Sequence, residues 1–459
     1  MEFPSGSPTP PPGCPAHQSQ NGSAPTHLER VPLHGPEFSA DPQRFYEYLR
    51  QYGPAAPVEV APGVPVTLVT EYSAALQVLQ SPDLFSKDAR RWRDLNEGRI
   101  PLDSPALPMM VHRPNALFAD GAEHLRLRQA ISDSLAKVDT HRLSRQVERI
   151  SAYLIEQFST RGTVDLIEEY AKLVSLLVVN DIFGCPAHLG DRLAEGWAGL
   201  WAGEDADAAS KLIGESLAEL VAYKRAQPGE DVPSWMLQHP SALSDEEMVN
   251  QLFTMTGAGA DPVRNLIGTG LMLVLSDERF YGGQYGGALL VEDAVDEVLW
   301  NNPPAPNLGI HYPTRDIEFF GMKLSAGDPV VVSFAAANTD PALSASRQML
   351  SKRAHLAWSA GPHACPAKDP ATLMAVGAME KLLNLLPDIE LAVPVENLNW
   401  RPSPFQRGLV ELPASFTPVQ LRSRTPDPAR PTAAAQPVDA TPSTPAKGGW
   451  WSSFLARWR

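Results

Sequence analysis

The sequence predicts a mainly α-helical globular protein with small β-sheets. Three observations predict it: many stretches with apolar residues at helical spacing, only a few short alternating stretches, and enough apolar residues to fill a core. Of the 459 residues, 43% are hydrophobic, 20% are charged and 8% are aromatic. A chain of this composition buries a large core and is not wholly disordered.

Helical periodicity dominates from about residue 36 to residue 420. Apolar residues recur there at i, i+3 and i+4, which is typical of helices with one buried face. The predicted helices are 42–52, 72–80, 121–136, 140–160, 164–182, 206–226, 244–276, 288–301 and 370–386. Strands are predicted for the short alternating stretches Val66–Val69, Ile317–Leu324 and Pro329–Ser333.

The two ends of the chain differ in composition from its centre. Residues 1–28 are rich in Pro, Ser and Gly with almost no large apolar side chains, so a disordered tail is predicted. A Pro-, Ala- and Thr-rich linker is predicted for residues 423–448. The chain therefore divides into this tail, one globular domain (29–422), the linker and a final peptide (449–459).

The final peptide combines aromatic and basic side chains. Trp450, Trp451 and Phe454 lie close to Arg457, a combination that suits a membrane interface or a groove on a partner protein. Two interpretations stay open at this point. The peptide is either an interaction segment or a tail whose tryptophans fold back on the globular domain.

Charge and cysteine content exclude several classes of protein. The formal net charge is −15 with a pI near 5.2, and no basic stripe runs along a predicted helix, so nucleic acid is not an expected partner. Three scattered cysteines do not form a disulfide framework. The N-terminal stretch has no apolar signal segment, and no run of about 18 apolar residues occurs. We therefore expect a cytoplasmic protein.

Cys365 lies in a loop, LAWSAGPHACPA (356–367), just before a predicted helix. Backbone N–H groups and the helix dipole at such a position lower the pKa of a thiol and favour the thiolate. His363 is a second source of positive charge when it is protonated. From the residues alone, Cys365 is either a metal ligand or an inert core cysteine.

This loop resembles the cysteine loop of the cytochrome P450 family. The family pattern is aromatic-x-x-Gly-x-(His/Arg)-x-Cys-x-Gly, and it places an axial thiolate under a heme. The matching residues are Trp358, Gly361, His363, Cys365 and, in place of the closing glycine, Ala367. The resemblance implies the cytochrome P450 fold, heme b (iron protoporphyrin IX) as cofactor and Cys365 as the iron ligand. Because Ala replaces Gly at 367, the backbone there is expected to avoid the left-handed region.

Two further segments resemble the parts of the family that bind the heme propionates. His124 and Arg128 match its His-x-x-x-Arg helix, and the i, i+4 spacing puts both side chains on one face. Taken alone, such a pair is more often a solvated basic face. Family members often carry a propionate-binding Arg five positions before the equivalent of Asp316. His311 stands there in this chain and is expected to donate one hydrogen bond.

The predicted helix over 244–276 resembles helix I, which crosses the heme face where oxygen binds. The family pattern there is small-Gly-x-acid-Thr. Ala258, Gly259 and Asp261 match it, whereas Pro262 replaces the threonine. The resemblance makes these four the catalytic positions. Because Pro262 has no N–H and crowds the carbonyl of Ala258, a kink is expected, and without the hydroxyl we expect slow or leaky oxygen activation, with Asp261 relaying protons through water.

A second departure from the family concerns its Glu-x-x-Arg motif in helix K. Glu297 is kept, but Trp300 replaces the arginine. A buried carboxylate without its cation costs about 3–5 kcal/mol. Glu297 is therefore expected to be partly solvated, protonated or bonded elsewhere, with the indole N–H of Trp300 as a candidate donor. This departure and the Pro/Ala-rich tail resemble an atypical actinobacterial group of the family that is encoded beside small GTPase modules.

The resemblance covers roughly residues 36–420 and implies a heme-thiolate monooxygenase that inserts one oxygen atom from dioxygen into a small hydrophobic substrate. Since the sequence has no flavin or dinucleotide motif, electrons are expected from a separate ferredoxin and ferredoxin reductase. The alternative is a catalytically impaired heme protein in a membrane-proximal GTPase signalling complex. In that case the final peptide would contact the small GTPase or a membrane surface, which makes the protein cytoplasmic but peripheral to the membrane.

Overall fold

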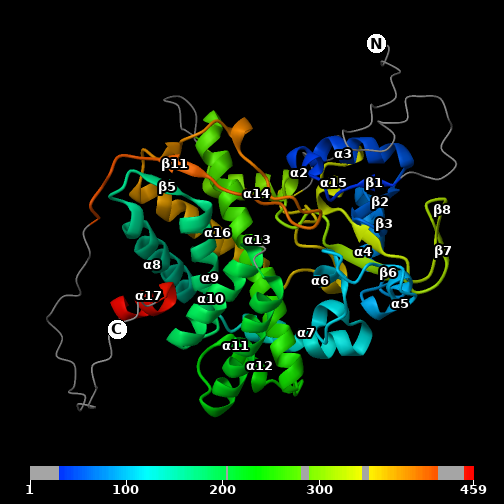
Figure 1. The fold of residues 1–459 in the computed structure, drawn as a ribbon, viewed down its shortest axis with the longest axis horizontal. Coiled ribbons are helices and arrows are strands. Elements are labelled where there is room, and N and C mark those ends of the chain that lie inside the picture. The colour runs from blue at the N-terminus through cyan, green and yellow to red at the C-terminus, as the bar shows by residue number, and fades with distance from the viewer. Residues whose placement is uncertain (1–29, 203–204, 281–288, 344–350, 422–448, 459) are drawn as a thin grey trace, which may run out of the picture.

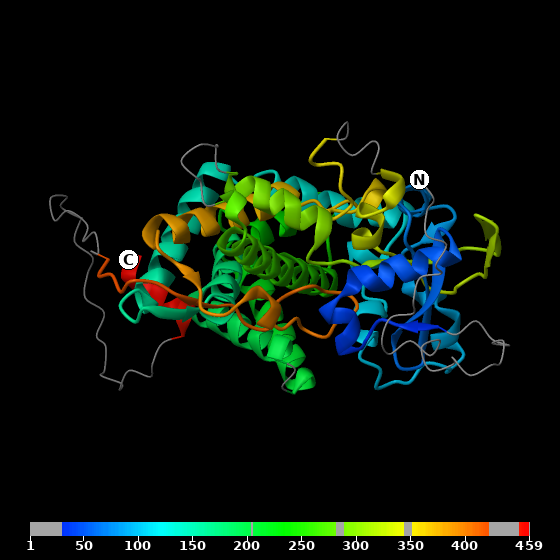
Figure 2. The same ribbon diagram turned by 90° about the horizontal axis from the view of Figure 1, so that it is seen from above.

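The structure is a computed structural model, and it describes residues 30–202, 205–280, 289–343, 351–421 and 449–458. The predicted N-terminal tail and the predicted linker lie outside the described residues. A bundle of helices occupies one side of the molecule and a six-stranded sheet the other, as Figures 1 and 2 show. The predicted mainly helical class is confirmed.

The described helices follow the predicted periodicity closely in the centre of the chain. They are α2 (Pro36–Ala40), α3 (Pro42–Leu49), α4 (Tyr72–Gln80), α5 (Arg93–Asn96), α6 (Leu107–Met110), α7 (Gly121–Leu135), α8 (Thr140–Phe158), α9 (Lys172–Ile182), α10 (Ala187–Ala202), α11 (Ala206–Ala226), α12 (Val232–Leu237), α13 (Asp245–Ser276), α14 (Val291–Asn301), α15 (Phe334–Asn338), α16 (Lys368–Leu385) and α17 (Trp450–Trp458). Helix α10 was not predicted, although Leu189, Leu193 and Trp197 recur in it at i, i+4 spacing.

The described strands form three small sheets. They are β1 (Val31–Pro32), β2 (Ala55–Ala61), β3 (Val64–Val69), β4 (Phe85–Ser86), β5 (Thr163–Asp165), β6 (Gly309–Pro313), β7 (Ile317–Phe319), β8 (Met322–Leu324), β9 (Val330–Val332), β10 (Glu390–Leu391) and β11 (Pro413–Ser415). The largest sheet has the order β1-β2-β3-β9-β6-β4. The predicted strand 317–324 is a hairpin of β7 and β8.

One predicted helix begins with different structure. Of the stretch 164–182, the first residues belong to β5, which pairs antiparallel with β11. A π-helical turn, Ile167–Ala171, then leads into α9. The prediction was wrong for these residues because strand pairing with a segment far along the chain overrides the local helical pattern.

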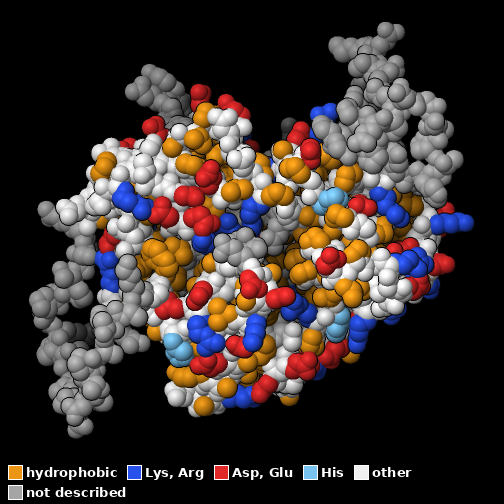
Figure 3. Space-filling view, viewed as in Figure 1, with side chains coloured by type: hydrophobic (Ala, Val, Ile, Leu, Met, Phe, Trp, Pro, Cys, Tyr) orange, Lys and Arg blue, Asp and Glu red, His pale blue; other side chains and the backbone are white. Residues whose placement is uncertain are grey.

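The main core lies between α8, α9, α13, α14 and α16. The longest helix, α13, runs through the centre of the molecule in both ribbon views (Figures 1 and 2). It begins with a capping box, in which Ser244 and Glu247 each accept a backbone N–H of the other. None of the described helices is both long and apolar enough to cross a membrane. On the face shown in Figure 3, acidic and basic side chains are interspersed.

The final peptide folds back on the helical bundle as α17 and packs against α10. Trp451 and Phe454 are 2% and 1% exposed, and both belong to the main core. The indole of Trp451 donates to the carbonyl of Cys185 (3.0 Å), and the carboxylate of Asp191 accepts the backbone N–H of Trp451 (2.8 Å). Trp450 remains 43% exposed. Two of the large apolar side chains of the peptide are therefore covered by its own chain.

Candidate active site

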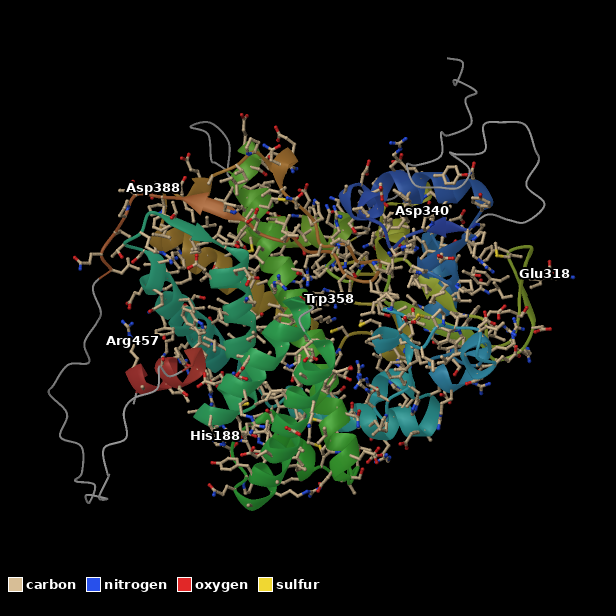
Figure 4. The ribbon with its side chains drawn as sticks, viewed as in Figure 1. His188, Glu318, Asp340, Trp358, Asp388 and Arg457 are labelled. Atoms are coloured by element: carbon tan, nitrogen blue, oxygen red, sulfur yellow. The ribbon has the colours of Figure 1, made fainter. Side chains whose placement is uncertain are left out.

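The loop that carries Cys365 is closed by its own backbone. The Cys365 N–H donates to the carbonyl of Trp358 (2.8 Å), and the Cys365 sulfur accepts the N–H of Ala367 (3.4 Å). Gly361 has a φ of +68°, and a Cβ there would lie 2.2 Å from the carbonyl oxygen of Leu79, so only glycine fits. Ala367 has a φ of −110°, which confirms that alanine is compatible with this position. Figure 4 shows Trp358 near the middle of the molecule.

The Cys365 thiol does not become a thiolate through the chain alone. Burial raises its pKa, and this effect outweighs the Ala367 N–H and the charges of Arg128 and Lys368, which lower it. The prediction that the loop and the helix start favour the thiolate was therefore wrong. A positive metal ion at the sulfur would supply the missing stabilisation, because metal binding deprotonates a thiol.

His124 and Arg128 on α7 both face the cysteine loop, which excludes the solvated basic face. The His124 ring is 3% exposed and lies against the His363 ring, with 4.0 Å between the ring centroids. The buried Nε2 atom of His124 has no hydrogen-bond partner among the described residues. Arg128 donates to the carbonyl of Ala364 and to the Ser132 hydroxyl. Both residues therefore lie beside the loop, and their binding of a heme propionate stays a prediction.

Basic side chains from four segments gather beside this loop. We call this set the basic cluster; its members are Lys87, His124, Arg128, His311 and His363. Burial lowers the pKa of His124 to about 4 and also lowers the pKa values of His311 and His363. His311 is buried on β6, where its Nδ1 donates to the carbonyl of Gly309 (2.9 Å).

Asp120 is the carboxylate of this region. It accepts the Ser86 hydroxyl and the backbone N–H of Lys87 (3.0 Å), and its Oδ1 lies 3.8 Å from Nε2 of His363. Burial opposes its ionisation, but these hydrogen bonds and the His363 ring hold its pKa far below the ordinary value. Asp120 and Lys87 were not predicted as site residues, since neither belongs to the matched motifs.

The middle of α13 exposes a stripe of small side chains. Ala258 is exposed, and Gly259 and Pro262 are partly exposed, whereas Ala260 and Asp261 between them are buried. Helix α13 is continuous through Pro262, so the proline is accommodated without ending it. These positions share one helix face at i, i+4 spacing, which leaves room beside the helix.

Asp261 is held in a second charged group, which we call the closed cluster: Asp261, Arg264, Asn265 and Arg401. The Asp261 carboxylate is 1% exposed and accepts from Arg401 (3.1 and 3.2 Å), Arg264 (3.4 Å) and Asn265 (3.4 Å). Arg401 also donates to the Asn265 carbonyl oxygen (2.9 Å). Arg401 lies 140 positions from Asp261, so no local pattern could have predicted the pair.

Glu297 pairs with a cation from outside the helix K motif, Arg279. Arg279 donates to both of its carboxylate oxygens (2.9 and 3.0 Å), and the Glu297 side chain is 32% exposed. The indole N–H of Trp300 donates instead to the carbonyl of Lys352 (2.6 Å), and its ring meets His355 edge-on. Two of the outcomes predicted for Glu297 occur: its carboxylate is partly solvated, and it is bonded to Arg279. The predicted hydrogen bond from the indole of Trp300 to Glu297 does not form.

The described residues fit heme b. The unpartnered His124 Nε2 and a basic cluster with a single carboxylate, itself already hydrogen-bonded, match the two propionates of this cofactor. The Cys365 sulfur, whose pKa burial raises, matches a cationic iron. His124 and Arg128 would hold the propionates, and Cys365 would hold the iron. The predicted hydrogen bond from His311 is not available from its neutral ring, because its N–H is donated to the carbonyl of Gly309. The stripe on α13 presents small, partly exposed side chains.

Comparisons with known proteins agree with this fit, although no family model matches the chain. The cytochrome P450 monooxygenase PikC of Streptomyces venezuelae is 30% identical over 394 residues, which cover 83% of this chain and 92% of PikC. The 2-hydroxy-5-methyl-1-naphthoate 7-hydroxylase of Streptomyces carzinostaticus is 28% identical over 392 residues, 82% of this chain and 94% of that enzyme. The structure of CYP154C4 from Streptomyces sp. W2061 superposes with a TM-score of 0.76 at 27% identity, covering 84% of this chain and 98% of that chain. The chain belongs to the cytochrome P450 family, whose members are heme b monooxygenases.

Proposed function

We propose that this cytochrome P450 inserts one oxygen atom of dioxygen into a small hydrophobic substrate. The observation that carries the proposal is the Cys365 loop, which presents a partly buried cysteine next to a basic cluster with an unpartnered histidine nitrogen. The curated relatives add support, because one of them is a hydroxylase of a naphthoate. Bound heme b supplies the iron at which dioxygen is activated and one oxygen atom is transferred.

The chain's own residues would then position and restrict the reactants. Cys365 would hold the iron, and the basic cluster would fix the orientation of the macrocycle through its carboxylates. The small residues Ala258 and Gly259 leave space on the exposed stripe of α13. The loop backbone at Gly361 lies directly against the end of α4, where an added Cβ would meet the Leu79 carbonyl oxygen at 2.2 Å.

Proton delivery is the weak point of this site. Pro262 offers no hydroxyl, and Asp261 is held by Arg401 and Arg264 in the closed cluster. To accept and pass a proton, the Asp261 carboxylate must break some of its hydrogen bonds to Arg401 and Arg264. This cost makes Asp261 a less efficient proton relay. We infer that turnover is slow or releases peroxide unless the substrate supplies a hydroxyl of its own.

Electrons would come from separate proteins. The chain has no flavin or dinucleotide motif. We propose a ferredoxin and a ferredoxin reductase as the redox partners.

The alternative is a heme protein with impaired turnover, recruited through the final peptide to a small GTPase or a membrane surface. The altered helix I and helix K motifs, Pro262 and Trp300, favour it. Against it, Trp451 and Phe454 of the peptide are buried in the core, which leaves Trp450 as its exposed large apolar side chain among those described. Deletion of residues 449–459 tests this alternative. If the alternative holds, the shortened protein no longer co-sediments with the GTPase or with vesicles. The enzyme proposal predicts that co-sedimentation of the shortened protein equals that of the full chain.

The heme-thiolate assignment is tested by spectroscopy. Reduced protein under carbon monoxide is expected to show the strongly red-shifted Soret band of a thiolate-ligated ferrous heme, and Cys365→Ala is expected to lose it. A red-shifted band in Cys365→Ala would overturn the assignment. Product formation from a substrate panel with added redox partners, compared with peroxide released per NAD(P)H consumed, then separates monooxygenation from uncoupled turnover.

A further inference from the structure

Lys87 is the member of the basic cluster that no matched motif contains. It directly follows β4, which pairs antiparallel with β6 in the register Phe85↔Pro313 and Ser86↔Tyr312. Continuing this register by one residue past the end of β4 sets Lys87 opposite His311 of β6. Cross-strand neighbours share one side of a sheet, so Lys87 and His311 belong to the same part of the site. Electrostatic interaction between the two groups agrees with this placement.

The charge of Lys87 is not balanced by the protein. The side chain is 6% exposed, and Nζ donates to the carbonyl of Ile310 (2.6 Å). An ammonium group has three N–H donors, so one carbonyl does not satisfy it. Among the described residues, no carboxylate oxygen lies within the 4.0 Å limit of an ion pair with Nζ. One acidic group, Asp120, acts on the charge of Lys87 and raises its pKa, but less than burial lowers it. The Asp120 carboxylate already accepts from the Ser86 hydroxyl and the Lys87 backbone N–H, and it faces His363.

We propose that Lys87 binds a propionate of the heme and so supplies the cation that His311 does not. The inference rests on the proposed heme-thiolate function. A propionate is the kind of ligand that this ammonium lacks: an anion with two acceptor oxygens, brought into a site that is already lined by N–H donors. A buried lysine without an anion lowers the stability of the folded protein, because the free energy of removing its charge from water is not compensated. Buried charges in proteins are therefore usually paired.

Two observations support this role for Lys87. Burial lowers its pKa to about 8, which shows that the chain alone stabilises its charge poorly. Burial also lowers the pKa values of His124 and His311, so neither ring carries full charge near pH 7, and the N–H of a neutral His311 ring is already donated to the carbonyl of Gly309. Of Lys87, Arg128 and these two rings, Lys87 and Arg128 therefore carry the positive charge at neutral pH.

A structural role for Lys87 is the competing explanation, since its bond to Ile310 also ties β4 to β6. The two roles are separated by changing the cofactor as well as the protein. Heme-free protein is titrated with hemin and, separately, with hemin dimethyl ester, whose propionates carry no charge. Binding is followed by quenching of tryptophan fluorescence in wild type, Lys87→Met, Lys87→Arg and the control Lys323→Met, which replaces an exposed lysine on β8.

If Lys87 holds a propionate, Lys87→Met weakens hemin binding by about ten- to a hundredfold and ester binding by less than about threefold. Lys87→Arg keeps most of the hemin affinity, and Lys323→Met changes neither. Equal loss for both ligands in Lys87→Met would overturn the proposal and leave a structural role, as would an unchanged affinity for hemin. A Lys87→Met protein that still binds the ester is folded, so misfolding is not mistaken for the expected result.

The heme-thiolate function itself fails differently. In that case wild-type protein binds neither ligand, or its reduced carbon monoxide complex lacks the red-shifted Soret band. Lys87→Met loaded with hemin at saturating concentration is expected to keep that band, because Lys87 is assigned to the propionate and not to the iron.

Discussion

The basic cluster and the closed cluster are both buried and charged, but they are balanced in opposite ways. In the closed cluster, one carboxylate, Asp261, is matched by two guanidinium groups of the same chain. In the basic cluster, five basic side chains face one carboxylate that is already hydrogen-bonded, and one imidazole nitrogen has no partner.

This difference in charge balance distinguishes a structural site, whose charges are paired within the chain, from a site that binds a ligand. Buried charges are stable when they are paired, and an unpaired one is costly. The closed cluster gains its stability from its own residues and resists change, which also limits Asp261 as a proton relay. The basic cluster gains stability from an anion that the chain does not contain.

The largest effect is expected in the closed cluster. Asp261→Asn keeps the shape of the side chain but leaves Arg401 without its anion and leaves Arg264 with Glu168 (3.6 Å) as its remaining carboxylate. The free energy of unfolding, measured by urea titration of heme-free protein, is expected to fall by about 3–5 kcal/mol. Asp103→Asn, at an exposed position, is the matched control and should leave it unchanged. A loss of less than 1 kcal/mol in Asp261→Asn would mean that this cluster is not closed.

A direct comparison of the two clusters uses one arginine from each. Arg401→Met removes donors to Asp261 and Asn265 and is expected to lower the free energy of unfolding by about 1.5–3 kcal/mol. Arg128→Met removes one cation from an excess of basic groups, and a loss below about 1 kcal/mol is expected. Urea titrations of both heme-free variants check the order. If Arg128→Met costs as much as Arg401→Met, the basic cluster is balanced without a ligand.

The basic cluster should also respond to pH. Because the pKa of His124 is about 4 in the folded chain and ordinarily 6.5, the unfolded chain binds more protons between these values. Stability of heme-free protein is therefore expected to fall as the pH decreases from about 6.5 towards 4. The charged and titratable groups that act on His124 are His363, Arg128, Asp120 and Lys87.

The measurement is urea unfolding at several pH values for wild type and two variants. His124→Gln is expected to flatten the decline, whereas His141→Gln, at an exposed position on α8, should follow wild type. If the stability of His124→Gln falls with decreasing pH as steeply as that of wild type, His124 is not the origin of the pH dependence.

The smallest effect is expected at the pair that replaces the helix K motif. The side chains of Arg279 and Glu297 are 53% and 32% exposed, and exposed pairs contribute little to stability. Arg279→Ala is expected to leave the urea midpoint unchanged within error. A clear shift of the urea midpoint would show that the pair of Arg279 and Glu297 stabilises the fold as the closed cluster does. The pair would then replace the stabilising role of the helix K motif.

Much of the site could be predicted from contiguous sequence. Cys365, His363 and Gly361 lie in one loop, and His124 and Arg128 share a face by their spacing, so local geometry fixes their relation. Lys87 could not be found in this way, because strand pairing brings it to a carbonyl 223 positions away. The pKa of Cys365 was also beyond prediction, because burial by the assembled fold outweighs the local helix start.

The sequence by itself determined the helical class, the limits of most central helices and the cysteine loop, since periodicity and contiguous motifs encode them locally. Only the tertiary structure decided which charges are paired. It placed Arg401 on Asp261, Arg279 on Glu297 and Trp451 in the core, and it left Lys87 without an anion. The physical reason is that charge pairing depends on distance and burial in the folded chain, and neither is written in the spacing of residues along it.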